Sequence, residues 1–190
     1  MLTQIASLLV DVVASFLVFT LLIRFLCQCL RVPLRHGIGE FIMAVTDWMV
    51  LPARRAIPAF FGLDWASFLL GWLCQMLGLW ALYAIAGLAF ASAPDIAAGL
   101  IAVLALIDLA RYSMYIFIFS LIVQAVLSWI NPYSPVAPIF DALNRPFLRP
   151  IRRFVPPLGN VDLSPLILIV LIQVLLIPLA EVRRMTGGLF

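Results

Sequence analysis

The sequence predicts an all-α integral membrane protein with about four transmembrane helices, arranged as two tandem parallel repeats. Three observations predict this fold: the composition, the length of the apolar segments and an internal repeat. Of the 190 residues, 65% are hydrophobic and 11% are charged, whereas a soluble domain is about half apolar and a quarter charged. So little polar surface cannot cover a soluble core, and the composition excludes both a soluble domain and a disordered chain.

Four apolar segments are long enough to cross a bilayer as helices, which takes about 20 residues each. The expected spans cover residues 5–30, 66–91, 111–130 and 163–180. Residues 96–107 are also apolar but too few to cross alone, and Asp108 and Arg111 follow them three residues apart, where they can pair on one helix face. We expect a helix break near this pair, with 96–110 as a separate membrane-edge segment. The alternative is one long tilted helix that runs to Ile130.

An internal repeat relates residues 46–75 to residues 144–173 at a constant offset of 98, without gaps. The matched residues are of scarce types, whereas chance matches in so apolar a chain would be mostly Leu, Ala or Val. They are Pro52 with Pro150, Arg54–Arg55 with Arg152–Arg153, Pro58 with Pro156, Asp64 with Asp162, and Gln75 with Gln173. The repeats are therefore residues 1–95 and 96–190, and two spans in each give both the same orientation.

The polar connections inside the repeats, residues 31–64 and 131–162, contain most of the positive charge. Each has four arginines: Arg31, Arg35, Arg54 and Arg55 in the first, and Arg145, Arg149, Arg152 and Arg153 in the second. The positive-inside rule predicts that both connections are cytoplasmic. Four spans then place both termini outside, where Arg183 and Arg184 oppose the assignment but are outnumbered.

The second connection has an amphipathic pattern over residues 141–155. Leu143, Phe147, Ile151 and Phe154 share one helical face, and Arg145, Arg149 and Arg152 share another. This pattern predicts a helix in the headgroup layer, kinked or broken at Pro150, with anionic lipid headgroups as partners. Two interpretations stay open: simple anchoring that sets the topology, or a specific cradle for a lipid or anion. The candidate residues of this structural or binding motif are Arg54, Arg55, Pro58, Asp64, Arg145, Arg149, Arg152, Arg153, Pro156 and Asp162.

Asp64 and Asp162 each precede the second span of their repeat. A carboxylate at this position caps the first turn of a helix and complements the helix dipole. It can also pair with Arg54–Arg55 or Arg152–Arg153, which would fix the connection against the span. The two roles are compatible.

Polar residues inside the expected spans form a second candidate set, because charges in a bilayer are costly unless they face an interior or water. The set is Asp11, Gln75, Asp108, Arg111 and Gln173. Gln75 and Gln173 lie near the bilayer middle, and we expect them to face each other across the interface of the repeats. They serve there either as a hydrogen-bonded link between helices or as a polar step in a permeation path. Asp11 is either a proton-coupling group or close enough to the outer face to reach water.

The sequence offers no catalytic constellation, nucleotide-binding loop or cluster of metal ligands. His36 is the sole histidine and stands beside a glycine in a polar connection. The net charge of +3 is too small to indicate nucleic acid as a partner. We therefore expect no cofactor, no metal and no enzymatic activity.

Three segments resemble the YggT family of small integral membrane proteins. NRPFLRPIRRFVPPLGNVDLSPL (residues 144–166) is similar to the family signature, TDWMVLPARRAIPAFFGLDWASFL (46–69) to its first-half form, and SWINPYSP (128–135) to the segment before the signature. The first half departs from the second at Asp47, which stands where the second half has Arg145. The resemblance implies a multi-pass protein of the bacterial cytoplasmic (inner) membrane, in a family associated with osmotic-stress tolerance, cell or plastid division and membrane-complex maturation.

Two functions remain as expectations. The first is a non-enzymatic structural or assembly factor, acting as a homo-oligomer or with a membrane-protein partner. The alternative is a small oligomeric transporter or channel component for ions or osmolytes. A continuous polar cavity between the spans would favour transport, and a packed interior would favour the structural role.

Overall fold

The computed structural model describes residues 1–32, 37–57, 63–87, 94–131, 134–154 and 162–187. Together they form six α-helices: α1 (Leu2–Cys29), α2 (Gly37–Ala56), α3 (Trp65–Ile85), α4 (Pro94–Ile130), α5 (Ala137–Phe154) and α6 (Ser164–Gly187). Four of them, α1, α3, α4 and α6, are long and apolar enough to cross a membrane, which confirms the predicted fold class. Arg35, His36, Pro58 and Pro156 lie outside the described residues.

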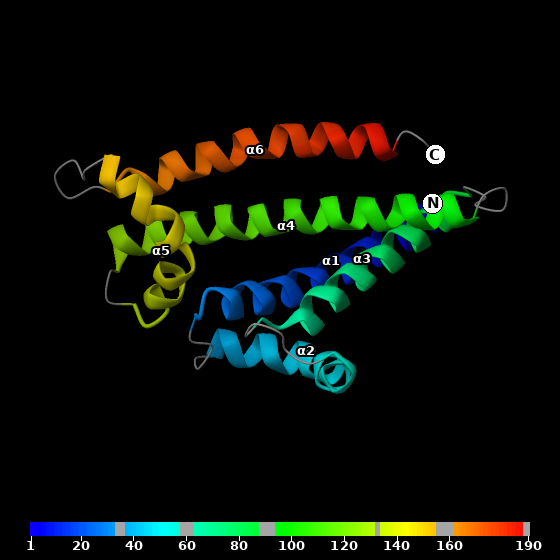
Figure 1. Ribbon diagram of the computed structural model, residues 1–190, viewed down its shortest axis with the longest axis horizontal. Helices are drawn as coiled ribbons and strands as arrows, with labels where there is room; N and C mark the ends of the chain where they lie inside the picture. Colours follow the sequence, from blue (N-terminus) through cyan, green and yellow to red (C-terminus); the bar gives the residue numbers. More distant parts are fainter. Residues whose placement is uncertain (33–36, 58–62, 88–93, 132–133, 155–161, 188–190) are drawn as a thin grey trace.

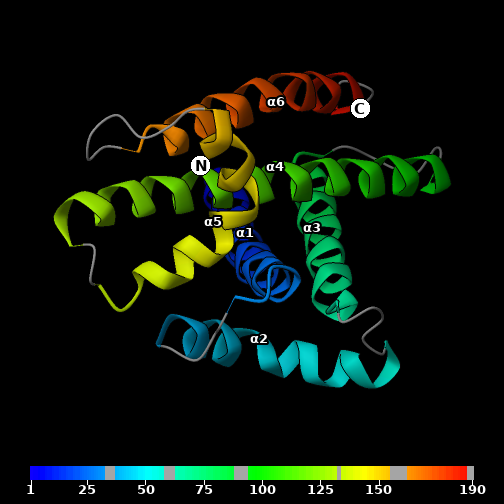
Figure 2. The same ribbon diagram turned by 60° about the vertical axis from the view of Figure 1, so that its left-hand side comes forward.

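Each half of the molecule repeats the order long helix, crossing helix, long helix (Figure 1). The four long helices run along the length of the molecule (Figure 1), and α2 passes beneath the ends of α1 and α3 (Figure 2). Both termini lie at the end of the molecule opposite to α5 (Figure 1). The even number of spans therefore agrees with the placement of the termini.

The expected break near Asp108–Arg111 is wrong, because α4 is continuous over its 37 residues. Residues 96–110 are its first turns rather than a separate membrane-edge segment. The carboxylate of Asp108 is 1% exposed and accepts hydrogen bonds from Gln75 of α3 and Arg183 of α6. The charge is thus satisfied by neighbouring helices, and the helix need not end to bring it to water.

Two other spans end at places that differ from the prediction. Helix α3 stops at Ile85, several residues before 91, because Gly87 adopts a left-handed backbone (φ 77°) that ends the helix while residues 88–91 are still apolar. Helix α6 continues past 180 to Gly187, because Arg183 turns inward to Asp108. In the sequence Arg183 indicates the end of the span, but in the structure its side chain pairs with Asp108 inside the bundle.

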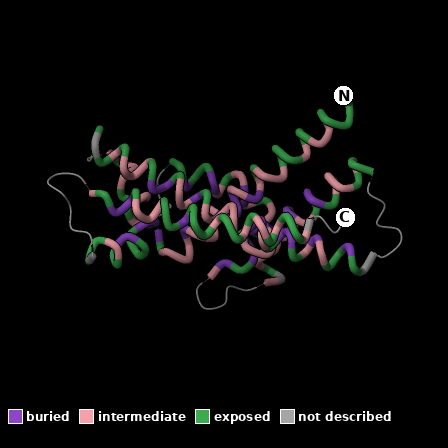
Figure 3. The backbone as a smooth tube through the Cα atoms, turned by 90° about the horizontal axis from the view of Figure 1, so that it is seen from above, coloured by how far each residue is buried: buried purple, intermediate pink, exposed green. Residues whose placement is uncertain are grey.

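Buried clusters lie along the length of the bundle. The central cluster joins Val18 and Leu22 of α1 with Leu109 and Ile116 of α4. Another lies between α3 and α4 around Leu104 and contains no buried residue of α1. The turns of α1 before Val18 contain no buried residue, and this N-terminal stretch is mostly exposed in Figure 3. Helix α1 therefore contributes to the interior only from its middle onward.

Both polar connections contain a helix with proline inside it, as expected from an Arg/Pro-rich amphipathic connection in each repeat. Helix α2 includes Pro52, and α5 includes Pro146 and Pro150. Helix α5 remains one helix but changes direction along its length (Figure 2), as a helix does where proline removes a hydrogen bond. Its Leu143 and Leu148 are buried.

Candidate functional site: the arginine-rich end

The two repeats place the same ion pair at equivalent positions. Arg54 of α2 meets Asp64 at 2.6 Å, and Arg152 of α5 meets Asp162 at 2.8 Å. Each pair joins the crossing helix to the start of the next long helix, as the sequence predicted. We call Arg54–Asp64 the first lock and Arg152–Asp162 the second lock.

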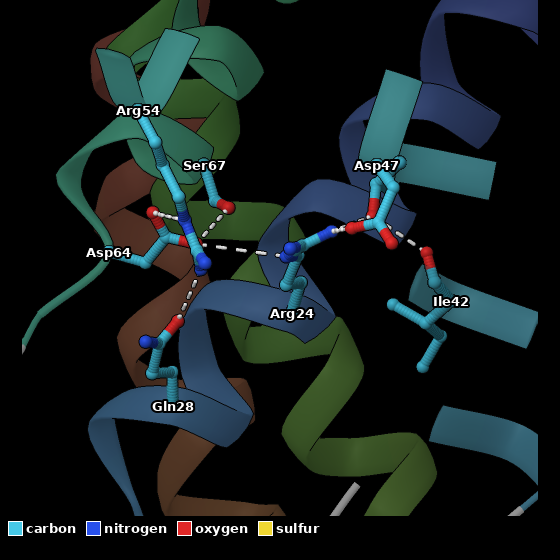
Figure 4. A network of polar contacts seen from close by, with 8 residues as sticks. Arg24, Gln28, Ile42, Asp47, Arg54, Asp64 and Ser67 are labelled. Carbon is cyan, nitrogen blue, oxygen red and sulfur yellow. Dashed lines mark hydrogen bonds and ion pairs between the residues drawn. The ribbon is translucent and has the colours of Figure 1, made fainter. Parts of the chain in front are cut away.

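The first lock belongs to a buried network, shown in Figure 4. The Ser67 hydroxyl donates a hydrogen bond to Asp64 over 2.7 Å, and the guanidinium of Arg24 lies 3.7 Å from the same carboxylate. Arg24 comes from α1, is 5% exposed, and also pairs with Asp47 of α2 at 2.6 Å. Three helices are therefore fastened by two arginines and two aspartates whose charges balance.

The pKa of Asp64 shows which influence prevails in this network. Burial alone would raise the pKa, but the hydrogen bonds from Arg54 and Ser67 and the positive charges of Arg54 and Arg24 lower it below its ordinary value. The same hydrogen bond raises the pKa of Arg54. Asp64 is therefore held as a carboxylate, and although it stands at the N-cap of α3, its side chain makes no cap hydrogen bond there.

The second lock is more open to solvent. The two arginines are similarly exposed, 41% for Arg152 and 37% for Arg54, but the carboxylates differ, 30% for Asp162 against 1% for Asp64. Asp162 also accepts a hydrogen bond from the backbone N–H of Ser164 at the start of α6. This bond and Arg152 overcome the effect of burial and lower the pKa of Asp162. Asp162 thus fills both roles expected from the sequence.

Helix α1 ends beside the second connection in an unusual conformation. The N–H of Val32 donates to the Cys27 carbonyl and that of Arg31 to the Gln28 carbonyl, which is the Schellman pattern of helix ends. Arg31 occupies the left-handed position of this motif with φ 53°. Glycine is the usual residue there, and a side chain raises the free energy by about 1 kcal/mol.

Arg31 borders a groove of about 750 Å³ between the end of α1 and α5. We call it the arginine groove, and its charged lining is Arg31, Arg145, Arg149 and Arg152. Among the described residues, only Arg152 of these four has a carboxylate within ion-pair distance, and that carboxylate is Asp162. The groove thus carries a clear excess of positive charge. The other two arginines of the motif, Arg55 and Arg153, are exposed and do not line it.

Arg24 and Asp47 are functional residues of this end that the sequence analysis did not select. The available signal was the departure of the first repeat from the second. Asp47 replaces Arg145 of the second repeat, and an added acid in an arginine-rich connection indicates a nearby basic partner. That partner is Arg24, which the sequence shows only as the charge near the end of the first apolar segment.

A second polar cluster lies between the spans, around Asp108. Its carboxylate accepts a hydrogen bond from Gln75 over 3.0 Å and bonds both Arg111 and Arg183. The pairing of Asp108 with Arg111 matches the prediction, whereas Arg183, 75 positions away in the sequence, was expected to face the outside. The cluster joins α3, α4 and α6.

The structure separates Gln75 from Gln173 and places Asp11 on the surface. Gln75 and Gln173 do not face each other: Gln75 is buried against Asp108, and Gln173 is exposed on the surface of α6. Asp11 is exposed in the N-terminal part of α1, where no α1 residue is buried. It therefore lies outside the interior of the bundle.

The chemistry of the arginine-rich end is recognition of anions. Four guanidinium groups around one groove can hold phosphate or carboxylate oxygens in two-pronged geometry. Within the described part of the chain, no group of three or more His, Cys, Asp or Glu side chains could hold a metal ion.

Comparison with known proteins identifies the family. The CCB3/YggT family model matches residues 3–85 and 103–182, so its two matched segments correspond to the two repeats. The chain belongs to the CCB3/YggT family. A relative is the uncharacterized protein YggT of Escherichia coli strain K12, 31% identical over 95% of this chain and 92% of its own. An uncharacterized Pseudomonas aeruginosa protein is 28% identical over 94% of this chain and 90% of its own. No solved structure matches the chain.

Membership in the CCB3/YggT family agrees with the resemblance seen in the signature segments. The relatives are described as uncharacterized, so they assign no activity. The geometry of this chain therefore carries the functional argument.

Proposed function

We propose that this protein is a non-enzymatic structural factor of the bacterial inner membrane that gathers anionic phospholipids at its arginine groove. In this proposal the arginine-rich end is cytoplasmic and supports assembly or mechanical stability of the membrane under stress. The observation that carries it is the uncompensated charge of the groove. Each arginine near an anionic surface adds about 1 kcal/mol of attraction.

The backbone at Arg31 supports a binding role for the groove. The chain keeps an arginine at a position where glycine would be more stable, and the residue at this position borders the groove. Strain at a residue that lines a site is typical of residues retained for function.

A neighbouring hollow favours a lipid over a soluble anion. It has a volume of about 550 Å³ and lies between α4, α5 and α6, with Phe117, Phe147 and Leu171 in its apolar lining. Helix α5 thus borders both a basic groove and an apolar hollow. A phospholipid has a headgroup for the first environment and acyl chains for the second.

The proposal is tested by the stabilisation that lipid confers, since a ligand that binds only the folded state raises its stability. The purified protein is titrated with phosphatidylglycerol or phosphatidylcholine in mixed micelles, and the melting temperature is recorded. We expect phosphatidylglycerol to stabilise the wild type, and Arg145→Gln with Arg149→Gln to weaken its affinity by roughly thirtyfold. Inorganic phosphate serves as a separate titrant.

The matched control removes the same charge from arginines outside the groove, as Arg55→Gln with Arg153→Gln. Retained affinity in this control and lost affinity in the groove variant support the proposal. Equal losses of phosphatidylglycerol affinity in both variants would show that general surface charge binds the lipid, and they overturn the proposal. Stabilisation by inorganic phosphate as strong as by phosphatidylglycerol assigns the groove to a soluble anion instead.

The transport alternative is favoured by one observation, the Asp108 cluster inside the spans. Its carboxylate is bonded to two arginines and an amide, an arrangement that links α3, α4 and α6 and therefore also suits a structural role. The hollows between the spans near α3 are lined mainly by apolar residues such as Leu77, which also favours the structural role.

Reconstitution separates the two functions. Potassium and proton movement are measured in vesicles that contain anionic lipid, with Asp108→Asn as the comparison, because Asp108 is the centre of the polar cluster between the spans. Flux above that of empty vesicles, lost in the variant, establishes transport and overturns the structural role.

A further inference from the structure

Gln173 is the unusual residue of helix α6. It lies within the span Ser164–Thr186 and is exposed, so in a bilayer its amide faces hydrocarbon. Its repeat equivalent Gln75 is buried and donates a hydrogen bond to Asp108. Transferring an amide from water to hydrocarbon without a hydrogen-bond partner costs several kcal/mol of free energy. Among the described residues of the single chain, Gln173 has no hydrogen-bond partner for this amide.

The residues around Gln173 form a regular stripe, which we call the α6 seam. Its members are Leu166, Val170, Gln173, Ile177, Ala180 and Arg184, and all six are exposed. Their spacing alternates between four and three residues, which is the heptad pattern. This period keeps one face of a helix against a second helix over its whole length, as in left-handed packing of membrane helices.

A second copy of the same helix satisfies Gln173 without any other partner. An amide both donates and accepts, so two glutamines can bond each other. A two-fold axis along the membrane normal places identical residues at identical depth. Gln173 of one copy then meets Gln173 of the other at the centre of the seam.

The charge at the end of the seam is compensated within each helix. Arg184 and Glu181 pair at 2.9 Å on the same helix, and both side chains are exposed. In a parallel pair of helices each Arg184 lies at the depth of the other copy's Arg184, so this internal pair with Glu181 is what offsets the like charge. The seam thus offers apolar packing and a self-complementary amide in one line.

We infer that the α6 seam is the interface of a parallel two-fold homodimer, with the Gln173 amides bonded across the axis. This interface is on α6 and does not depend on the arginine groove. The dimer and the proposed lipid binding can therefore fail separately.

Disulfide cross-linking in native membranes tests the interface. Ile177→Cys and Val170→Cys place thiols on the seam, and Val182→Cys places one on the opposite side of α6, where Val182 is also exposed. The parent chain with Cys27, Cys29 and Cys74 gives the baseline. We expect oxidation to yield a dimer from both seam variants well above Val182→Cys.

The role of the amide is tested by Gln173→Leu in the Ile177→Cys and Val170→Cys chains. Loss of an interhelical hydrogen bond lowers the association constant by about fivefold, and Gln173→Asn retains part of it. Cross-linking equal at the seam and at Val182 overturns the interface. Products with a different polypeptide also overturn it, because they assign the seam to another protein. Unchanged cross-linking in Gln173→Leu overturns the amide contact.

Discussion

The first and second locks occupy equivalent positions, yet their surroundings have diverged. The carboxylate of the first lock is buried beside Arg24, and the charges of Arg24, Asp47, Arg54 and Asp64 balance. The second lock is exposed and leaves Arg145 and Arg149 facing a groove. The first connection thus uses its charges to join helices, whereas the second leaves positive charge available for a ligand.

A single exchanged position explains much of this difference. Asp47 neutralises Arg24 in the first repeat, whereas the equivalent Arg145 adds charge to the groove. The long helix that contacts each connection also differs between the repeats at the residue that meets this position. Arg24 bonds Thr46 in the first repeat, and Gln124 bonds Asn144, the equivalent of Thr46, in the second. The neutral amide needs no acid, so arginine is tolerated at 145.

The comparison is tested most strongly by removing each carboxylate. Asp64→Asn removes the ion-pair partner of Arg54 and leaves the buried Arg24 with Asp47 alone, and we expect the free energy of unfolding to fall by about 3 kcal/mol. Asp162→Asn should lower it by less than about 1 kcal/mol, because this pair is exposed. Both are measured by SDS titration in mixed micelles, with the exposed Glu40→Gln as control. Equal effects would show that the locks are not differentiated.

Exchanging the charges between repeats tests the role of position 47. Asp47→Arg puts a second cation beside Arg24, and we expect the free energy of unfolding to fall by about 2 kcal/mol. The reciprocal Arg145→Asp should change it by less than about 0.5 kcal/mol, because this side chain is exposed. It should instead weaken binding of phosphatidylglycerol. A stable Asp47→Arg protein would contradict the assignment of the first lock as a joint.

Helix packing differs between the repeats as well. A Cβ on Gly78 would lie 2.8 Å from that of Ala14, whereas one on Gly71 would have its nearest neighbour at 3.7 Å. Gly78→Ala should therefore lower the free energy of unfolding by about 1–3 kcal/mol. Gly71→Ala should be neutral or slightly stabilising, since alanine favours helix over glycine by up to about 1 kcal/mol.

The second repeat has large residues at both equivalent positions. Its α6 carries Ile169 and Leu176 where α3 has Gly71 and Gly78. The close contact at Gly78 is therefore a feature of α3 that its repeat equivalent does not share. Equal tolerance of alanine at positions 71 and 78 would show that the close approach of α1 and α3 is not limiting.

The smallest expected effect is the pH dependence of the second lock. Because the pKa of Asp162 is lowered in the folded protein, its contribution is complete above the ordinary aspartate pKa of about 3.9 and is lost as pH falls through the lowered value. The difference in unfolding free energy between wild type and Asp162→Asn should thus vanish in acid. A difference that grows with acidification would contradict the lowered pKa.

Much of the fold could be predicted from the sequence, because bilayer crossing depends on local composition. Four spans, the repeat and the partners of Asp64 and Asp162 all follow from apolar length or from matched residues. The continuity of α4 and the inward turn of Arg183 could not be predicted. They depend on contacts between residues as far as 75 positions apart. A charge inside an apolar segment has the same local pattern whether it ends a helix or is paired by a neighbour.

The candidate site was predicted in part for the same reason. Arginines of the connections are visible as a cluster, so Arg145 and Arg149 could be selected. Arg24 is an isolated residue, and only packing of α1 against α2 reveals its two acidic partners. Arg31 could be assigned to the first connection, but its position beside the groove could not be predicted, because it depends on the left-handed backbone at the end of α1.

Helix α4 has a consequence for how the protein meets its bilayer. At 37 residues it is about 55 Å long, while the hydrocarbon layer is about 30 Å thick. A helix with so large a mismatch fits by tilting, and the favourable tilt changes with the thickness of the layer. Asp108 ties α4 to α3 on one side and to α6 on the other. A change in bilayer thickness that re-tilts α4 is therefore transmitted mechanically to both halves of the molecule.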